Sequence, residues 1–416
     1  MIVNRCPELL APAGDAERLR AALRYGADAV YVGADRFGMR TAAAFFAQEK
    51  LREACELAHA QGAKLYLACN TLPRNAEFAA LPEFLSFAQA CGVDALIVTD
   101  LGVLALCKRY APRVDVHIST QAGVTNYAAA NQLYELGAQR IVTARELSLD
   151  EIAEIRAKTP KALEIECFVH GAMCVSFSGR CLLSNYLTGR DSNRGDCAQP
   201  CRWQYALQEE KRPGEFFPIA EDENGTYILN SRDMCLLAHL PQLAAAGIDS
   251  FKIEGRAKSA YYTAVCVNAY RCALDGYKAS GFDPDYRPDD WILEEPMKVS
   301  HREYCTGFYF SSPTDRAEIY GRGGYVRKWD VAAVAEDWRD GVLYATQRNR
   351  FFAGDTLEIM MRGAPPVRVQ VTDLRNADGE PIDSTPHPMM PFSFACPIPT
   401  PPGAYLRMER TETEVR

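Results

Sequence analysis

Short apolar runs alternate with amphipathic segments along the first 280 residues or so of the chain. Runs of strand length occupy residues 9–14, 29–34, 64–70, 95–100, 115–121, 140–146, 163–171 and 250–255. Between most of them, apolar positions recur with helical spacing up to a glycine, as in "LREACELAHAQGAK", and glycine is a usual helix stop. Strands that alternate with helices pair in parallel, so eight such units predict a closed (β/α)8 barrel of the TIM type.

One interval between predicted strands is much longer than the others. It separates the seventh and eighth strands and forms an insertion at about residues 172–249. In barrels of this type the loops that follow the strands form the active-site face. We therefore expect the insertion to lie over the functional site.

The pattern changes after the predicted barrel, which covers residues 1–280. Residues 326–416 lose helical periodicity and show strand alternation, as in "VRVQVTDL", with turn signals such as Asp378-Gly379 between the runs. This pattern predicts a small all-β barrel domain, joined to the first domain through a connector at 281–325.

Composition excludes some classes of protein. The chain is 48% hydrophobic and 24% charged, which is ordinary for a soluble globular protein. The N-terminus lacks the pattern of a secretion signal, and no apolar stretch approaches the ~20 residues of a membrane span. We expect a cytoplasmic protein. The formal net charge of −8 argues against general coating of nucleic acid but allows a local basic groove.

Five of the fifteen cysteines fall within the insertion, four of them at the spacing C-x6-C-x15-C-x3-C and the fifth in "NSRDMC". These are Cys174, Cys181, Cys197, Cys201 and Cys235. A reducing compartment disfavours disulfides. A Cys–His nucleophile built from His170 and Cys174 would leave the other thiols unexplained. Zinc usually takes two tight cysteine pairs, whereas an iron–sulfur cluster accepts looser spacing. The spacing favours a cluster, with zinc and purely structural thiols as alternatives.

Side-chain alternation in the predicted strands nominates residues that line the barrel. A period of two places polar side chains on the inner face of strands five, seven and eight. The residues expected there are His117, Ser119, Gln121, Glu166, His170, Lys252 and Glu254, with Asn70 at the end of strand three. The alternative is a hydrogen-bonded polar layer of the core without a chemical role.

Several long motifs resemble the collagenase-like peptidase family U32. They are "ECFVHGAMCVSFSGRCLLS" (166–184), "NYLTGRDSNRGDCAQPCRW" (185–203), "SFKIEGRAKSAYY" (250–262) and "SHREYCTGFYF" (300–310). The family name implies peptide hydrolysis, yet the sequence contains neither H-E-x-x-H nor G-x-S-x-G. The motif "GRDSNRG" and the β domain are most similar to the branch that hydroxylates the wobble uridine of tRNA to 5-hydroxyuridine.

The resemblance implies oxygen-independent hydroxylation with a 4Fe–4S cluster and a small carboxylate donor such as prephenate. Cys174, Cys181 and Cys197 match family ligands, and Cys235 is favoured as the fourth over Cys201. The expected catalytic residues are Glu166, His170, Lys252, Glu254 and Arg256, and the expected substrate-binding residues are Asn70, His117, Gln121, Arg190 and Arg194. The two arginines of the "GRDSNRG" loop suit phosphate contacts with a tRNA anticodon loop, or alternatively salt bridges within the loop. A peptidase and a non-catalytic scaffold that binds RNA or a partner protein are the alternative functions.

Overall fold

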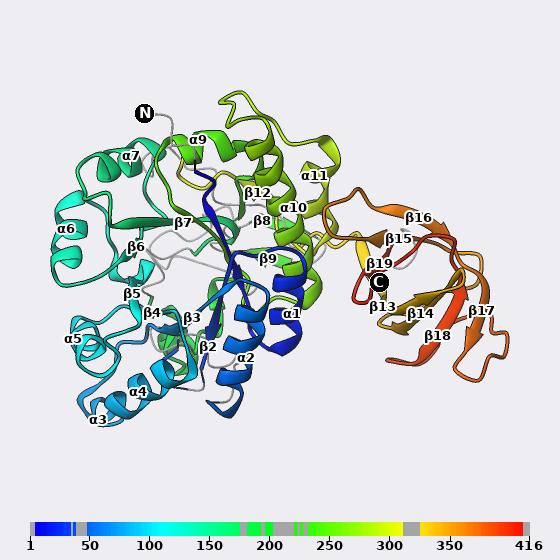
Figure 1. Ribbon diagram of the computed structural model, residues 1–416, viewed down its shortest axis with the longest axis horizontal. Helices are drawn as coiled ribbons and strands as arrows, with labels where there is room; N and C mark the ends of the chain where they lie inside the picture. Colours follow the sequence, from blue (N-terminus) through cyan, green and yellow to red (C-terminus); the bar gives the residue numbers. More distant parts are fainter. Residues whose placement is uncertain are drawn as a thin grey trace, which may run out of the picture.

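The computed structural model describes residues 5–34, 36–38, 48–174, 181–192, 196–202, 220–222, 225–227, 232–310 and 325–410. Eight parallel strands close a barrel, as the sequence predicts (Figure 1). They are β1 (Glu8–Pro12), β2 (Ala29–Gly33), β3 (Lys64–Cys69), β4 (Ala95–Val98), β5 (Asp115–Ile118), β6 (Arg140–Val142), β7 (Glu164–Ala172) and β11 (Ser250–Ile253). The barrel closes because β11 pairs with both β7 and β1.

Helices follow the strands and cover the outside of the barrel (Figure 1). They are α1 (Ala16–Arg24), α2 (Gln48–Ala60), α3 (Asn75–Phe78), α4 (Leu81–Cys91), α5 (Leu101–Tyr110), α6 (Tyr127–Glu135), α7 (Leu149–Ala157), α9 (Leu240–Ala245) and α10 (Ala260–Ala279). Their ends carry the expected caps. Asp100 accepts from the Val103 N–H at the start of α5, and Gly92 ends α4 in the left-handed conformation. Among the described residues, no helix is both long and apolar enough to cross a bilayer.

The insertion between β7 and β11 contributes several short elements. Besides α9, the described ones are α8 (Leu183–Thr188), η4 (Pro200–Arg202), β8 (Ala220–Asp222), β9 (Gly225–Tyr227), β10 (Asp233–Cys235) and η5 (Leu237–His239). Strand β10 pairs antiparallel with the end of β7, and it also pairs with β12 (Tyr304–Cys305) from the segment expected to be a connector. Asp233 on β10 forms a buried ion pair with Arg302, at 2.7 Å between Oδ1 and Nη2. The insertion is therefore tied to the barrel sheet at its C-terminal end.

The C-terminal residues fold into an antiparallel half-barrel. Its seven strands are β13 (Trp329–Arg339), β14 (Val342–Gln347), β15 (Thr356–Met360), β16 (Val367–Gln370), β17 (Thr372–Asn376), β18 (Pro391–Ala395) and β19 (Tyr405–Glu409). They follow the order β16-β15-β19-β13-β14-β18-β17. The prediction of an all-β domain is confirmed, with the sheet open between β16 and β17 in the pairings of the described residues.

Helices α10 and α11 (Asp290–Glu294) lie between the barrel and the half-barrel (Figure 1), and the 3-10 helix η6 (Glu295–Lys298) follows α11 directly. Arg407 of β19 is fully buried there and pairs with Glu295 at 2.6 Å and with Glu358 at 3.0 Å. Tyr25 of the barrel donates to the Met360 carbonyl, and its ring packs against Tyr405. These contacts hold the two domains together through buried polar as well as apolar side chains.

Candidate active site at the barrel mouth

A cavity of about 200 Å³ opens at the C-terminal ends of the barrel strands. Its floor and walls come from the ends of β2, β3, β5, β7 and β11, and the insertion lines its upper part. The polar and charged lining residues include Asn70, Ser119, Thr120, Gln121, Arg145, Lys252, Glu254 and Arg256. The cavity can hold several water molecules, whose share of liquid volume is about 30 Å³ each. It therefore has room for a small ligand.

Four of the five cysteines singled out in the sequence line this cavity: Cys174, Cys181, Cys197 and Cys201. Two of the sulfur atoms accept backbone hydrogen bonds, Cys181 from the Leu183 N–H and Cys197 from the Gln199 N–H, both at 3.3 Å. Hydrogen bonds to sulfur stabilise the thiolate form that a metal requires and tune the potential of an iron–sulfur cluster. The local backbone is thus suited to thiolates.

Side-chain hydroxyls tie the two cysteine-bearing segments together. Ser184 at the start of α8 accepts a hydrogen bond from the Ala198 N–H at 2.9 Å. Ser192 donates to the carbonyl of Cys181. Both serines are buried, and their bonds join Cys181 to Ser192 and Ser184 to Ala198 at the cavity wall.

Cys235 occupies a different environment from the other four cysteines. It lies on β10, opposite His170 of β7, and it is not among the residues that line the cavity. Burial raises the pKa of its thiol to about 11, which disfavours the thiolate. The structure therefore brings Cys201, and not the favoured Cys235, to the cavity with the other three thiols.

Zinc and an iron–sulfur cluster require different arrangements of their thiolates. No three His, Cys, Asp or Glu side chains in the described ranges are placed to hold a single metal ion. A single zinc ion needs its thiolates to converge at about 2.3 Å from one point. A 4Fe–4S cluster binds each of four thiolates at a different iron, so its ligands surround a volume. Four thiols at the wall of one cavity match the number of ligands that a 4Fe–4S cluster takes.

His170 does not face the cavity, and the expectation that it points into the barrel is wrong. The pairing of β7 with β11 shifts: Phe168 pairs with Lys252, but His170 pairs with Ile253. This β-bulge reverses the alternation, so His170 turns outward to helix α10. Its Nε2 lies 3.3 Å from the Cys266 sulfur, and burial lowers its pKa to about 3. His170 is therefore a neutral core residue.

His117 faces the barrel interior but lies at the opposite end from the mouth. Its ring packs edge-on against Tyr66, with centroids 4.7 Å apart. It lines a second cavity, of about 550 Å³, at the N-terminal ends of the strands. Burial and then the charge of Arg140 lower its pKa well below the ordinary value. The structure does not place His117 with the other expected substrate-binding residues.

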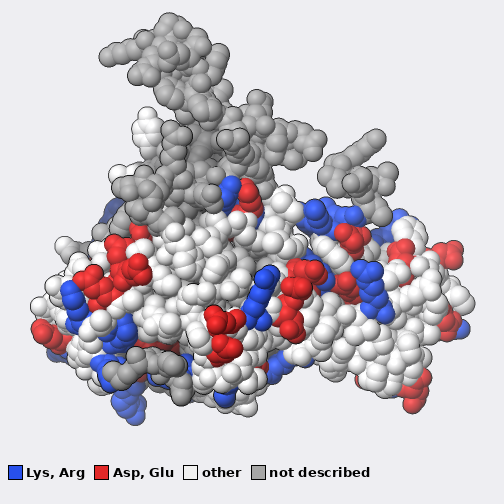
Figure 2. Space-filling model, turned by 90° about the horizontal axis from the view of Figure 1, so that it is seen from above, with Lys and Arg blue, Asp and Glu red and all other residues white. Residues whose placement is uncertain are grey.

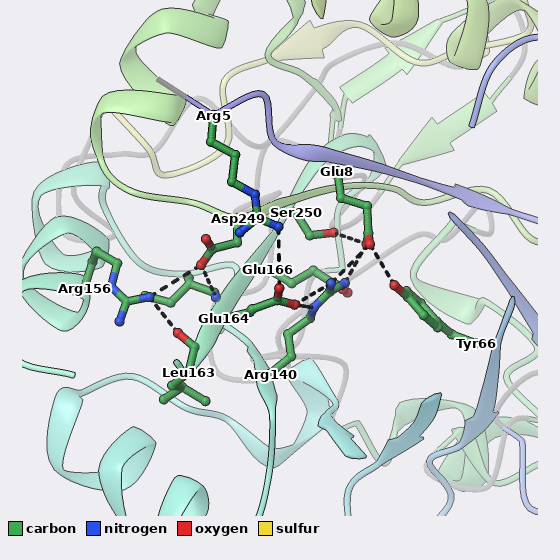
Figure 3. A network of polar contacts seen from close by, with 11 residues as sticks. Arg5, Glu8, Tyr66, Arg140, Arg156, Leu163, Glu164, Glu166, Asp249 and Ser250 are labelled. Carbon is green, nitrogen blue, oxygen red and sulfur yellow. Dashed lines mark hydrogen bonds and ion pairs between the residues drawn. The ribbon is translucent and has the colours of Figure 1, made fainter. Parts of the chain in front are cut away.

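Glu166 belongs to an ionic network that fills the lower part of the barrel (Figure 3). Its two carboxylate oxygens bind Lys252 at 2.7 Å and Arg140 at 2.9 Å. Arg140 also pairs with Glu8 at 2.7 Å and with Glu164 at 2.6 Å. Burial alone would raise the pKa of Glu8, but Arg140 holds it below the ordinary value. Glu166 therefore anchors Lys252 and does not itself line the mouth cavity.

The sequence reasoning did not single out Glu8 or Arg140. Both lie at the first residue of a strand, where alternation alone could have assigned them to the inner face. Charged residues at strand starts are more often exposed, so the pattern did not indicate that these two side chains point inward. Only closure of the barrel brings β1 and β6 to face each other across the interior.

Lys252, Glu254 and Arg256 are buried and line the cavity, as the alternation predicts for the first two. The ammonium group of Lys252 lies 4.6 Å from the centroid of the Tyr31 ring. The hydroxyl of Tyr31 donates to Glu254 Oε2 at 3.3 Å and to the Ile253 carbonyl at 3.1 Å. A Cβ atom at Gly33 would lie 2.6 Å from Nη1 of Arg256. Glycine at that position therefore leaves space for the guanidinium group.

Only some of the remaining expected substrate-binding residues line the cavity. Asn70 and Gln121 line the cavity and hydrogen-bond each other at 3.3 Å. Arg190 is exposed and pairs with Asp196, with 2.7 Å between Nη2 and Oδ1. This contact is the salt bridge within the loop that the sequence offered as the alternative to phosphate binding. Arg194 lies outside the described residues.

The sequence matches two family descriptions, one for each of the two domains of the fold. Residues 14–319 match peptidase family U32, and residues 327–407 match the C-terminal domain of that family. The chain belongs to peptidase family U32.

Curated relatives within this U32 family carry names that refer to RNA. The chain is 36% identical to tRNA hydroxylation protein P1 of Bacillus subtilis, over 94% of this chain and 92% of the relative. It is 37% identical to tRNA hydroxylation protein P of Escherichia coli, over 91% of each chain. It is also 39% identical to the 23S rRNA 5-hydroxycytidine C2501 synthase of Escherichia coli, over 64% of this chain and 39% of that protein.

Cys174 and His170, the cysteine–histidine pair that the sequence offers to a peptidase mechanism, do not lie together. Cys174 lines the mouth cavity, whereas Nε2 of His170 contacts Cys266 on α10. A nucleophilic cysteine needs its base within hydrogen-bond reach. The two residues are close in sequence, but the bulge in β7 directs them to different sides of the barrel wall.

Proposed function

We propose that this protein is an RNA hydroxylase that converts the wobble uridine of tRNA to 5-hydroxyuridine without molecular oxygen. The observation that carries the proposal is the convergence of four thiols and several cationic side chains on one cavity. The names of the relatives, which refer to hydroxylation of tRNA and rRNA, support the substrate class.

The thiols of Cys174, Cys181, Cys197 and Cys201 would hold a 4Fe–4S cluster. A cluster at this place would supply one-electron redox chemistry next to the cavity. The backbone N–H groups of Leu183 and Gln199 already point at two of the sulfur atoms. The polar side chains of the barrel mouth line the same cavity.

The charged groups of the mouth suit a small carboxylate donor, for which prephenate is our candidate. Lys252 and Arg256 supply positive charge at the cavity wall. Lys252 is held in place by Glu166 and by the face of Tyr31, so it is preorganised for an anion. Glu254, oriented by the Tyr31 hydroxyl, is the carboxylate positioned to accept a proton from the substrate.

The RNA would present a single base to this cavity. Enzymes that modify a base extrude it from its stack, because the reacting atom is otherwise inaccessible. Asn70 and Gln121 offer amide groups at the cavity wall that can hydrogen-bond a uracil edge. On the face seen in Figure 2, Lys and Arg side chains stand beside Asp and Glu. RNA contact would therefore rely on local groups near the mouth.

A deletion strain tests the proposal. We expect its tRNA to lack 5-hydroxyuridine and its derivatives, measured by mass spectrometry of nucleosides. A plasmid with the wild-type gene should restore them, and one carrying Cys174→Ala should not. Cys107→Ala, which alters a buried cysteine of α5, is the matched control and should restore them. Unchanged tRNA in the deletion strain, or gelatin cleavage by the purified protein that disappears with Cys174→Ala, would reject the proposal.

A further inference from the structure

Arg145 lines the mouth cavity and has no carboxylate partner in the described part of the chain. Arg145 is half-buried, and several fully buried cations of the described fold differ from it. Arg140, Lys252, Arg302 and Arg407 are each paired with at least one carboxylate. An uncompensated guanidinium at a cavity wall is costly unless an anion is there to balance it.

Two contacts fix the orientation of the Arg145 guanidinium group. Its central carbon lies 4.0 Å from the centroid of the Phe168 ring, so the group stacks on the aromatic face. Its Nη1 donates to the Ala172 carbonyl at 3.2 Å. Both anchors belong to β7, the strand that leads directly into the cysteine insertion.

The anchors leave one edge of the guanidinium group unused. Nε is buried and has no hydrogen-bond partner, and the structure shows no hydrogen bond from Nη2 to a described residue. Nε and Nη2 together form the two-donor fork that matches the two oxygens of a carboxylate. A bound carboxylate would satisfy the buried donor and neutralise the charge at the same time.

We propose that Arg145 forms a subsite that binds the carboxylate of a small organic acid within the mouth cavity. The inference rests on the proposed function, because the occupant would be the donor for hydroxylation. A small acid fits better than an RNA phosphate, since the cavity holds about 200 Å³ and a nucleic-acid backbone remains at its rim when one base enters. Arg145 is a substrate-binding residue in this assignment, separate from Lys252 and Arg256.

Calorimetric titration of the anaerobically purified holoprotein with prephenate tests the subsite. We expect Arg145→Gln to weaken prephenate binding about ten- to hundredfold, the usual range for a charge-assisted bidentate contact. Arg145→Lys should recover part of the affinity, because it restores the charge without the fork. The control Arg375→Gln removes an exposed arginine paired with Asp373 on the C-terminal sheet and should bind as the wild type does.

The outcomes separate the subsite from the proposed function. Prephenate affinity that is unchanged in Arg145→Gln, with thermal unfolding also unchanged, overturns the subsite. Inorganic phosphate that competes as well as prephenate also overturns it, because the fork would then not select a carboxylate. Binding that depends on Arg145 in a protein whose deletion leaves tRNA unchanged supports the subsite and rejects only the hydroxylase.

Discussion

Lys252 donates a hydrogen bond to Glu166 across 2.7 Å inside the barrel, with both side chains buried. The second oxygen of Glu166 accepts from Arg140 at 2.9 Å. One carboxylate therefore links the ionic network at the bottom of the barrel to the cation at the floor of the mouth cavity. The position of Lys252 depends on charges that a ligand in the cavity does not touch.

Removing the charge of Glu166 should destabilise the fold and displace Lys252. Glu166→Gln leaves two buried cations with less compensation, and breaking a buried ion pair costs about 3–5 kcal/mol. We expect the free energy of unfolding, measured by urea denaturation, to fall by about that amount. The control is Glu154→Gln, which breaks an exposed pair with Lys158 on α7 and should leave the midpoint unchanged. Equal midpoints for Glu166→Gln and the wild type would show that the network is not needed for stability.

The choice between Cys201 and Cys235 can be made by metal analysis. Because Cys201 lines the cavity and Cys235 does not, Cys201→Ala should lose iron and acid-labile sulfide while Cys235→Ala should keep both. The measurement is iron and sulfide per chain, with the absorption spectrum, after anaerobic purification. Loss of iron in Cys235→Ala together with full iron in Cys201→Ala would restore the assignment made from the sequence.

Stability should decrease as the pH falls below about 6.5, the ordinary pKa of histidine. Burial lowers the pKa of His170 to about 3. Between these values the unfolded chain binds a proton that the folded chain does not, so acid favours unfolding. His170 alone contributes a slope of at most about 1.4 kcal/mol per pH unit, and His117 acts in the same direction.

Urea denaturation at pH 7.5 and pH 5.5 measures this effect. We expect His170→Gln to reduce the loss of stability between the two pH values, because glutamine does not titrate. His387→Gln replaces an exposed histidine of the C-terminal domain and serves as the control. A wild-type protein equally stable at both pH values would contradict the prediction.

The junction between the domains depends on Arg407. Arg407→Met leaves Glu295 buried and Glu358 nearly so, with one cation fewer between them. We expect destabilisation by about 3 kcal/mol or more, seen in calorimetry as the C-terminal domain unfolding at a lower temperature than the barrel. Arg368→Met is a matched control, because Arg368 also pairs with Glu358, at 3.6 Å, but is mostly exposed. A single transition at the wild-type temperature in Arg407→Met would show that apolar packing alone joins the domains.

The sequence by itself determined the order of strands and helices, the closed barrel, the place of the insertion and the all-β character of the C-terminal domain. These features follow from local periodicity, which each segment carries in its own residues. The same periodicity correctly directed Lys252 and Glu254 inward, because the extra residue of the bulge lies in β7 and not in the segment that carries Lys252 and Glu254.

Only the tertiary structure decided which side chains share the site. The bulge that turns His170 outward arises from the pairing of β7 with β11, two strands separated by the whole insertion. Cys235 leaves the cavity because β10 pairs beside β7, and Arg145 enters it because Phe168 and Ala172 hold its guanidinium group. Each is a contact between segments that are apart in the sequence. Such contacts form only when the barrel closes, so the spacing of residues along the chain does not predict them.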